Sequence, residues 1–170
     1  MTEIIYRDAT IADVDAIDAL FRDVFAETFA HLYDPADLAA FFAKFTRAAW
    51  LEEMADPELA FRVAEADGQL AAYVKTGRVS LPVTPDGPAA ELRQIYIARP
   101  WRGAGIADAL MDWTTDRARA NGAEELYLSV FIDNHRARRF YERYGFEGVG
   151  RYDFVVGTHI DEDVLMRLKL

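Results

Sequence analysis

The sequence of 170 residues contains no cysteine. That absence excludes disulfides, cysteine nucleophiles and cysteine metal sites, and it favours a reducing compartment such as the cytoplasm. No apolar run is long enough to span a membrane, and residues 1–4 are unlike the start of a signal peptide. The formal net charge of −10 argues against nucleic-acid and anionic-membrane partners, because an acidic surface repels both.

Internal repeats, low-complexity tracts and linker-like segments are also missing from the sequence. We therefore expect one domain over residues 1–170. Hydrophobic residues make up 52% of the chain and aromatic residues 13%, which supplies a hydrophobic core and excludes a disordered chain. The excess of acidic residues would suit a cationic ligand such as a polyamine, although net charge most often serves solubility.

The spacing of apolar residues predicts an α/β chain. Strands are expected near residues 4–7, 61–66, 70–79, 92–97, 125–131, 148–156 and 163–169. Helices are expected after Thr10, from Pro35 towards residue 54, over residues 106–120 and over residues 137–144. Asp67-Gly68 predicts a tight hairpin turn. The predicted order is therefore β-α-α-β-β-β-α-β-α-β-β.

A glycine-rich turn joins the predicted strand at 92–97 to the helix that follows it. Gly103, Ala104 and Gly105 carry almost no side chain, so the main-chain N–H groups of the turn are accessible. Together with the positive end of the helix dipole they form a suitable site for a phosphate or pyrophosphate, and Arg102 adds a positive charge. The alternative is a helix start that uses glycine only for tight packing.

Two common phosphate-binding motifs do not match this turn. A dinucleotide-binding fingerprint needs a third glycine where Asp108 stands, and a P-loop needs Gly-Lys-Ser/Thr where Gly105-Ile106-Ala107 stands. The turn resembles instead the acyl-CoA loop of the GCN5-related N-acetyltransferases, with the pattern Gln/Arg-x-x-Gly-x-Gly/Ala. Here the loop has the sequence Arg102-Gly103-Ala104-Gly105-Ile106-Ala107.

A second segment resembles the N-x-x-A-x-x-F-Y-x-x-x-G-F signature of the same family. It consists of Asn134, Ala137, Phe140-Tyr141 and Tyr144-Gly145-Phe146. The two motifs have the order and spacing that the family requires, so the chain resembles this family over nearly its whole length. The resemblance implies the acyl-CoA N-acyltransferase (GNAT) fold, with a mixed, twisted central sheet and flanking helices.

The resemblance also implies an activity and a set of cofactor-binding residues. The activity is acetyl transfer from acetyl-CoA to a primary amine by direct attack in a ternary complex, which needs no cysteine and no metal. The implied acetyl-CoA-binding residues are Ile95, Tyr96, Ile97, Arg102, Gly103, Ala104, Gly105, Ile106, Ala107, Asn134 and Tyr141. Two of these side chains could have a structural role instead of a cofactor-binding one, because asparagine is favoured as a helix N-cap and tyrosine is common in strands. These are Asn134 and Tyr96.

Two residues match catalytic positions of the family. Tyr141 corresponds to the tyrosine that protonates the departing thiolate, and its alternative is a core tyrosine on the apolar face of its helix. Glu91 corresponds to the glutamate that some members use as general base, and its alternative is a solvated carboxylate at a strand end. Weaker candidates for contact with the acceptor amine, in the segment between the first two strands, are Glu27, His31, Tyr33 and Asp34.

His159, Asp161 and Asp163 alternate in an expected strand and would share one face. Such alternation usually marks an exposed strand face, so we predict no metal site, although the two carboxylates could equally receive a polycation.

The acceptor is a separate question. Further segments resemble the PaiA-type bacterial spermidine/spermine acetyltransferases: Glu27-Thr28-Phe29, Tyr73-Val74-Lys75, Gln94-Ile95-Tyr96-Ile97, and an ending with Val156-Gly157 followed by Asp161 to Met166. That resemblance implies a polyamine such as spermidine. The alternatives are another small amine, a protein N-terminus, or a non-catalytic acetyl-CoA sensor on the same fold. The family resemblance also implies a homodimer.

Overall fold

The structure, a computed structural model, describes residues 2–170. The strands are β1 (Ile4–Asp8), β2 (Leu59–Ala66), β3 (Gln69–Gly77), β4 (Ala89–Ile97), β5 (Glu125–Phe131), β6 (Glu147–Val156) and β7 (His159–Lys169). The helices are α1 (Val14–Phe29), α2 (Pro35–Phe42), α3 (Arg47–Ala55), α4 (Ile106–Ala120) and α5 (His135–Tyr144), and three short 3-10 turns are η1 (Ile11–Asp13), η2 (Ala30–Leu32) and η3 (Arg99–Trp101).

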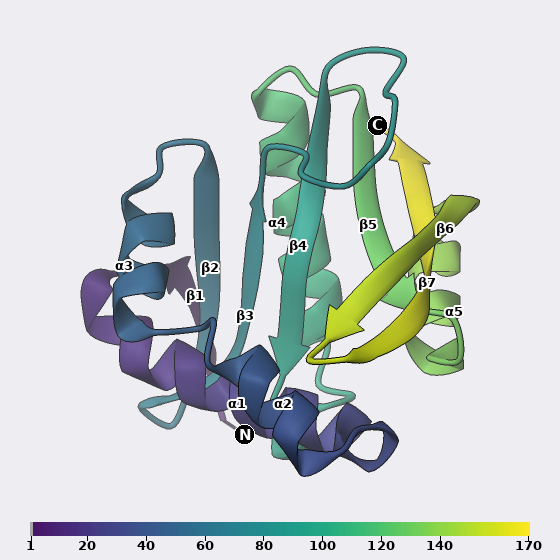
Figure 1. The fold of residues 1–170 in the computed structure, drawn as a ribbon. Helices are drawn as coiled ribbons and strands as arrows, with labels where there is room; N and C mark the ends of the chain where they lie inside the picture. The colour runs from purple at the N-terminus through teal and green to yellow at the C-terminus, as the bar shows by residue number, and fades with distance from the viewer. Residues whose placement is uncertain (1) are drawn as a thin grey trace.

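The seven strands form one mixed sheet in the order β1-β2-β3-β4-β5-β7-β6. All neighbours are antiparallel except β4 and β5, which run parallel. Their pairing covers only residues 89–91 with residues 125–127, and beyond it the two strands diverge (Figure 1). The facing edges of both strands are therefore left without ladder partners along the rest of their length.

A bulge in β4 begins where the pairing with β5 ends. Thr76 of β3 pairs with Leu92, and Lys75 pairs with Gln94, so Arg93 is one extra residue on β4. A bulge bends its strand and increases the local twist. The sheet consequently opens between β4 and β5, along the part of β4 that holds Ile95, Tyr96 and Ile97.

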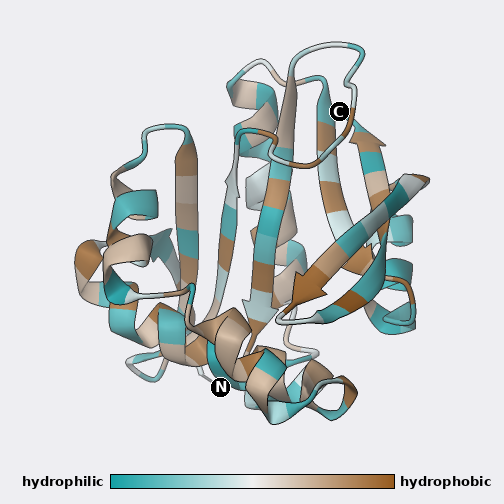
Figure 2. Ribbon diagram, viewed as in Figure 1, coloured by the Kyte–Doolittle hydropathy of each residue, from teal (hydrophilic) through white to brown (hydrophobic). Residues whose placement is uncertain are grey.

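The two faces of the sheet are covered by different helices, which bury two separate apolar clusters. In β3, Ala72 and Val74 pack in a cluster with residues of α4 and α5, whereas Tyr73 between them packs in a cluster with α1, α2 and α3. Alternate strand residues point to opposite faces, which explains this division. Figure 2 shows the result as apolar bands interleaved with polar ones along the strands.

The helical segment between β1 and β2 differs from the prediction. Two helices were expected there, and the structure has three. The third begins because the Thr46 hydroxyl accepts a hydrogen bond from Ala49 N at 3.1 Å, which caps α3. The continuous aromatic pattern of this segment had concealed that start. No helix within residues 2–170 has both the length and the apolar character needed to cross a membrane.

The predicted hairpin turn is confirmed, and a glycine also ends α5. Asp67 and Gly68 both have positive φ, 52° and 73°, as a two-residue hairpin turn requires. At the end of α5, Gly145 N donates to Glu142 O (3.0 Å) and Phe146 N to Tyr141 O (3.2 Å). This Schellman arrangement positions the last turn of α5, which carries Tyr141.

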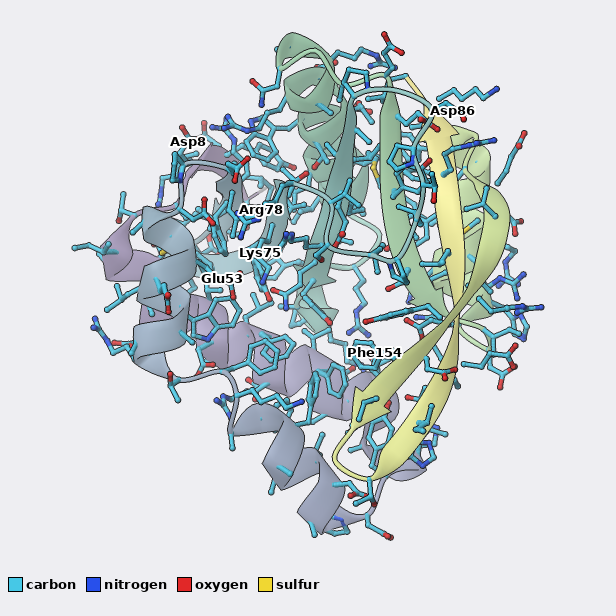
Figure 3. The ribbon with its side chains drawn as sticks, turned by 45° about the horizontal axis from the view of Figure 1, so that its top comes forward. Asp8, Glu53, Lys75, Arg78, Asp86 and Phe154 are labelled. Carbon is cyan, nitrogen blue, oxygen red and sulfur yellow. The ribbon has the colours of Figure 1, made fainter. Side chains whose placement is uncertain are left out.

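A partly buried ion pair joins α3 to the middle of the sheet. Lys75 Nζ lies 2.7 Å from Glu53 Oε2 (Figure 3). Burial lowers the pKa of Lys75, and the nearby Glu53 carboxylate acts in the opposite direction. The Lys75 ammonium also lies 5.4 Å from the centre of the Trp50 ring on α3, at cation–π distance.

Candidate active site

A cleft of about 720 Å³ lies where β4 and β5 diverge. Its walls come from α1, from β4 and the loop after it, from β5, from α5 and from the β6–β7 hairpin. The aromatic side chains in its lining are Phe25, Phe29, Tyr33, Tyr96, Trp101, Phe131, Phe140, Tyr141 and Phe154. Figure 3 shows Phe154 on the side of the hairpin that faces α1 and α2, where its ring lies 5.7 Å from that of Phe41.

The glycine loop forms one part of the lining. Gly103 and Gly105 both have φ of 81°, a conformation that suits glycine. The structure of residues 2–170 contains no protein acceptor for the N–H groups of residues 103–108. Six donors at a helix N-terminus fit a phosphate or pyrophosphate. Among the predicted loop residues, Ala104 is exposed and lies outside the cleft lining.

Arg102 holds this loop against α1. Its Nε donates to Ile97 O (3.3 Å), and its Nη1 donates to Glu27 Oε1 (3.2 Å). Glu27 also lies 3.7 Å from Arg99. Glu27 therefore serves as a counter-ion for the loop and lies outside the cleft lining, and His31 is an exposed residue outside it as well. The prediction that these two residues contact the acceptor does not fit their positions.

Helix α5 brings Asn134 and Tyr141 to the cleft. Asn134 Oδ1 accepts a hydrogen bond from Ala137 N (3.3 Å), so the residue is the N-cap of α5 and also part of the cleft lining. Tyr141 is 9% exposed, and burial raises the pKa of its phenol to about 12. The phenol is consequently protonated at neutral pH and available as a donor.

Three of the four arginines on α5 line the cleft, namely Arg136, Arg139 and Arg143. Arg138 differs from them, because its Nη1 donates to the main-chain oxygen of Ile132 at 2.8 Å. The three cleft arginines give this wall a positive charge, which suits an anionic ligand.

The predicted strand residues Ile95, Tyr96 and Ile97 line the opposite wall, on the edge of β4 that has left β5. The Tyr96 ring lies 5.4 Å from Phe21 and 5.8 Å from Tyr73, and burial raises the pKa of its phenol. The side chain thus belongs to the core beneath the cleft. The free main-chain edge of β4 can hydrogen-bond an extended ligand in the manner of an added strand.

Glu91 lies elsewhere. The residue is 5% exposed, and its carboxylate accepts hydrogen bonds from Ser80 N (2.7 Å) and Leu81 N (3.1 Å). It is an anchor for the loop that precedes β4 and lies outside the cleft lining. A general base has to reach the proton it removes, so Glu91 does not fit that role in this structure.

Two other carboxylates face the cleft from β7. Asp161 and Asp163 are only 6% and 5% exposed, so the expectation of an exposed strand face was wrong. Asp161 accepts a hydrogen bond from the Tyr33 hydroxyl, and its Oδ1 lies 2.9 Å from His159 Nε2. Tyr33 therefore lines the cleft, through a contact that the sequence did not reveal, and its contact with the acceptor stays a prediction. The alternation of residues 159, 161 and 163 was the signal for this group.

Asp163 has no basic partner among residues 2–170. Burial raises the pKa of its carboxyl to about 7, the carboxylate of Asp161 acts in the same direction, and a hydrogen bond with Ser129 opposes them. Within residues 2–170 no lysine, arginine or histidine contributes to this pKa. A buried carboxyl that faces a cleft without a counter-ion is suited to receive a proton or a cation.

Asp163→Asn is expected to stabilise the fold at alkaline pH. The pKa of Asp163 is about 7 in the folded protein and 3.8 ordinarily. In the wild type, the free energy of unfolding is therefore highest below pH 3.8, where the carboxyl is protonated, and it falls as the pH rises to 7. The gap between the two pKa values corresponds to a loss of at most about 4 kcal/mol, and since water in the cleft reduces this loss we expect about 2 kcal/mol. Urea unfolding near pH 4.5 and pH 8 measures the effect. Equal pH dependence in the two proteins would contradict it.

The comparison with protein-family models agrees with this geometry. The model of the acetyltransferase (GNAT) family matches residues 17–146. The chain belongs to this family. It is accordingly an acetyl-CoA-dependent N-acetyltransferase, as its two sequence motifs predicted.

Individual relatives of this acetyltransferase cover most of its length. An uncharacterized N-acetyltransferase of Mycobacterium tuberculosis is 29% identical over 157 residues, which cover 92% of this chain and 97% of the relative. The aminoalkylphosphonate N-acetyltransferase of Salmonella typhimurium is 27% identical over 141 residues, which cover 83% of each protein.

Among solved structures, the PaiA N-acetyltransferase from Thermoplasma acidophilum in complex with coenzyme A matches with a TM-score of 0.78. The two proteins share 19% sequence identity, and the match covers 99% of each chain. At this identity the likeness concerns the fold. The predicted GNAT fold is thereby confirmed.

Proposed function

We propose that this acetyltransferase acetylates a small cationic primary amine, with a polyamine such as spermidine as the leading candidate. The observation that carries the proposal is that one cleft is lined both by groups that bind an anion and by groups that bind a cation. The loop at residues 103–108 offers N–H groups that have no acceptor within residues 2–170, and Asp161 and Asp163 offer carboxylates for a cation. An anionic acyl donor and a cationic acceptor would thus bind side by side.

The donor would be held mainly by main-chain groups. The loop N–H groups bind the pyrophosphate of acetyl-CoA, and the free edge of β4 at Ile95, Tyr96 and Ile97 hydrogen-bonds the pantetheine arm. An N–H group at the end of this strand polarises the thioester carbonyl. The side-chain amide of Asn134 adds a contact to the pantetheine arm.

Tyr141 would act as the general acid. Its phenol faces the cleft and is protonated at neutral pH, so it can give its proton to the thiolate that departs from the acetyl carbon. Direct attack by the amine needs no enzyme nucleophile, which agrees with a sequence that has no cysteine.

An amine panel tests the proposal. With acetyl-CoA, we expect spermidine to be acetylated with a kcat/KM at least about tenfold above that of n-butylamine, because the second ammonium adds a charge-assisted hydrogen bond worth about 1.5 kcal/mol. Thiol release and the mass of the product are the measurements. An aminoalkylphosphonate and an alanine-initiated peptide represent the other acceptors, and preference for either would identify that alternative.

The same assay separates an enzyme from a sensor. Tight acetyl-CoA binding by calorimetry without acetylation of any amine in the panel would favour a non-catalytic acetyl-CoA-binding module. Thiol release from acetyl-CoA without any amine is measured as the blank, so that hydrolysis is not mistaken for acetyl transfer.

A further inference from the structure

We infer that Asp163 is the group that removes the proton from the acceptor ammonium, and that Asp161, held by Tyr33 and His159, anchors that ammonium beside it. The inference rests on the proposed function and assigns the base of the reaction to β7 instead of β4. It also defines the acceptor as a primary alkylammonium.

The two carboxylates differ in their surroundings, and this difference assigns their roles. Both oxygens of Asp161 have hydrogen-bonding neighbours, the Tyr33 hydroxyl and His159 Nε2. Asp161 is therefore fixed in orientation and suited to hold a charge in place. Asp163 has Ser129 as its hydrogen-bonding neighbour and no basic partner within the described chain, so its carboxylate can accept a proton.

Several neighbouring elements contribute the groups around Asp163. Tyr33 follows η2, Tyr96 lies on β4 and Ser129 on β5, and these three residues line the same cleft. On β6, Tyr152 is the register partner of Asp163. Burial raises the pKa values of the Tyr33 and Tyr96 phenols, and the charge of Asp163 acts in the same direction on both. They are neutral donors at physiological pH, so Asp161 and Asp163 supply the negative charge at this end of the cleft.

The walls beside the carboxylates indicate the carbon skeleton of the acceptor. Phe25, Phe29, Phe131 and Phe154 line the cleft, and the rings of Phe29 and Phe131 meet edge to face with centroids 6.0 Å apart. Apolar walls next to an anion suit methylene groups that end in an ammonium. An amino acid carboxylate at the same place would be repelled by Asp161 and Asp163.

The proton balance of the step is complete. The ammonium gives one proton to Asp163, and the free amine forms a C–N bond with the thioester carbonyl carbon. The C–S bond then breaks, and the thiolate takes the Tyr141 proton. The nitrogen, now attached to the acetyl group, returns its second proton to the Tyr141 oxygen through water. Asp163 finally releases its proton to solvent, so the net products are the amide, the thiol and one proton.

Asp163→Asn tests the inference through its pH dependence. The wild-type kcat/KM should fall about tenfold per pH unit below a pH of about 7, where Asp163 becomes protonated. At pH 7 the variant should be about thirtyfold slower, and its rate should keep rising towards pH 9 as free amine accumulates. Glu162→Gln is the matched control, because Glu162 is an exposed neighbour on the same strand.

Spermidine binding to the CoA complex provides a readout that does not depend on turnover. Calorimetry should show affinity that decreases below pH 7 in the wild type and stays constant in Asp163→Asn. If the wild type acetylates no amine, the proposed function fails and this inference with it. If the wild type is active but Asp163→Asn keeps both its rate and the acid limb, only the inference is overturned. Equal losses in Glu162→Gln would also overturn it, because they would show a structural effect of the strand.

Discussion

Replacing Tyr141 with phenylalanine is expected to lower kcat about a hundredfold or more, in the range of general acid catalysis, while the affinity for CoA stays the same. The variant loses only a hydroxyl group. The ring keeps its packing against Phe140 and Phe146, whose centroids lie 5.5 and 5.8 Å away. Because the phenol pKa is about 12, wild-type activity should show no alkaline limb from this residue below about pH 11.

Steady-state kinetics and CoA calorimetry together measure the effect of Tyr141→Phe. The matched control is Tyr144→Phe, which removes a phenol one turn later on α5. The Tyr144 hydroxyl donates to Asp108 Oδ1 (2.9 Å) and lies outside the cleft lining. Undiminished kcat in Tyr141→Phe would remove this residue from the mechanism, and equal losses in both variants would indicate a structural effect of α5.

Gly105→Val is expected to weaken CoA binding at least about a hundredfold, since it disturbs several charge-assisted N–H bonds worth about 1.5–3 kcal/mol each. At a φ of 81° a β-branched side chain is strained, so the loop has to change its conformation. A Cβ at this position meets no atom within 4 Å, so the loss should come from the loop backbone and not from a clash in the core.

Gly122→Val controls for backbone strain, because it introduces the same change at the other end of α4. Gly122 follows α4 with a φ of 85°, and a Cβ there also meets no atom within 4 Å. We expect this variant to have a lower melting temperature and unchanged CoA affinity by calorimetry. If Gly105→Val binds CoA as tightly as Gly122→Val does, the N–H groups of the loop do not hold the pyrophosphate.

The parts of the site that were predictable are those that depend on local conformation. The turn at 102–107 could be identified because glycine at two positions allows positive φ, and a helix start leaves its N–H groups unpaired whatever surrounds it. Asn134 and Gly145 likewise mark the ends of α5 through contacts within a few residues. Such turns and caps are formed by residues close together in the sequence, so they can be recognised as short sequence motifs.

The acceptor side was less predictable, because its residues meet across long stretches of chain. Tyr33 and Asp161 are 128 residues apart, and they meet because the β6–β7 hairpin lies against the segment after α1. Glu27 matched a substrate position by its place in the chain, yet it pairs with Arg102, 75 residues away. Helical spacing shows which face of α1 is apolar, but it does not show that Glu27 on this helix lies against the distant loop that holds Arg102.

The sequence alone determined that this chain has a glycine-rich turn before one helix and a tyrosine on another, both on an α/β sheet, because glycine turns, caps and apolar periodicity act over a few residues. Only the tertiary structure decided which carboxylates face the cleft. Glu91 turns to its own loop and Asp163 enters the cleft, since strand pairing and the packing of the β6–β7 hairpin set the direction of each side chain.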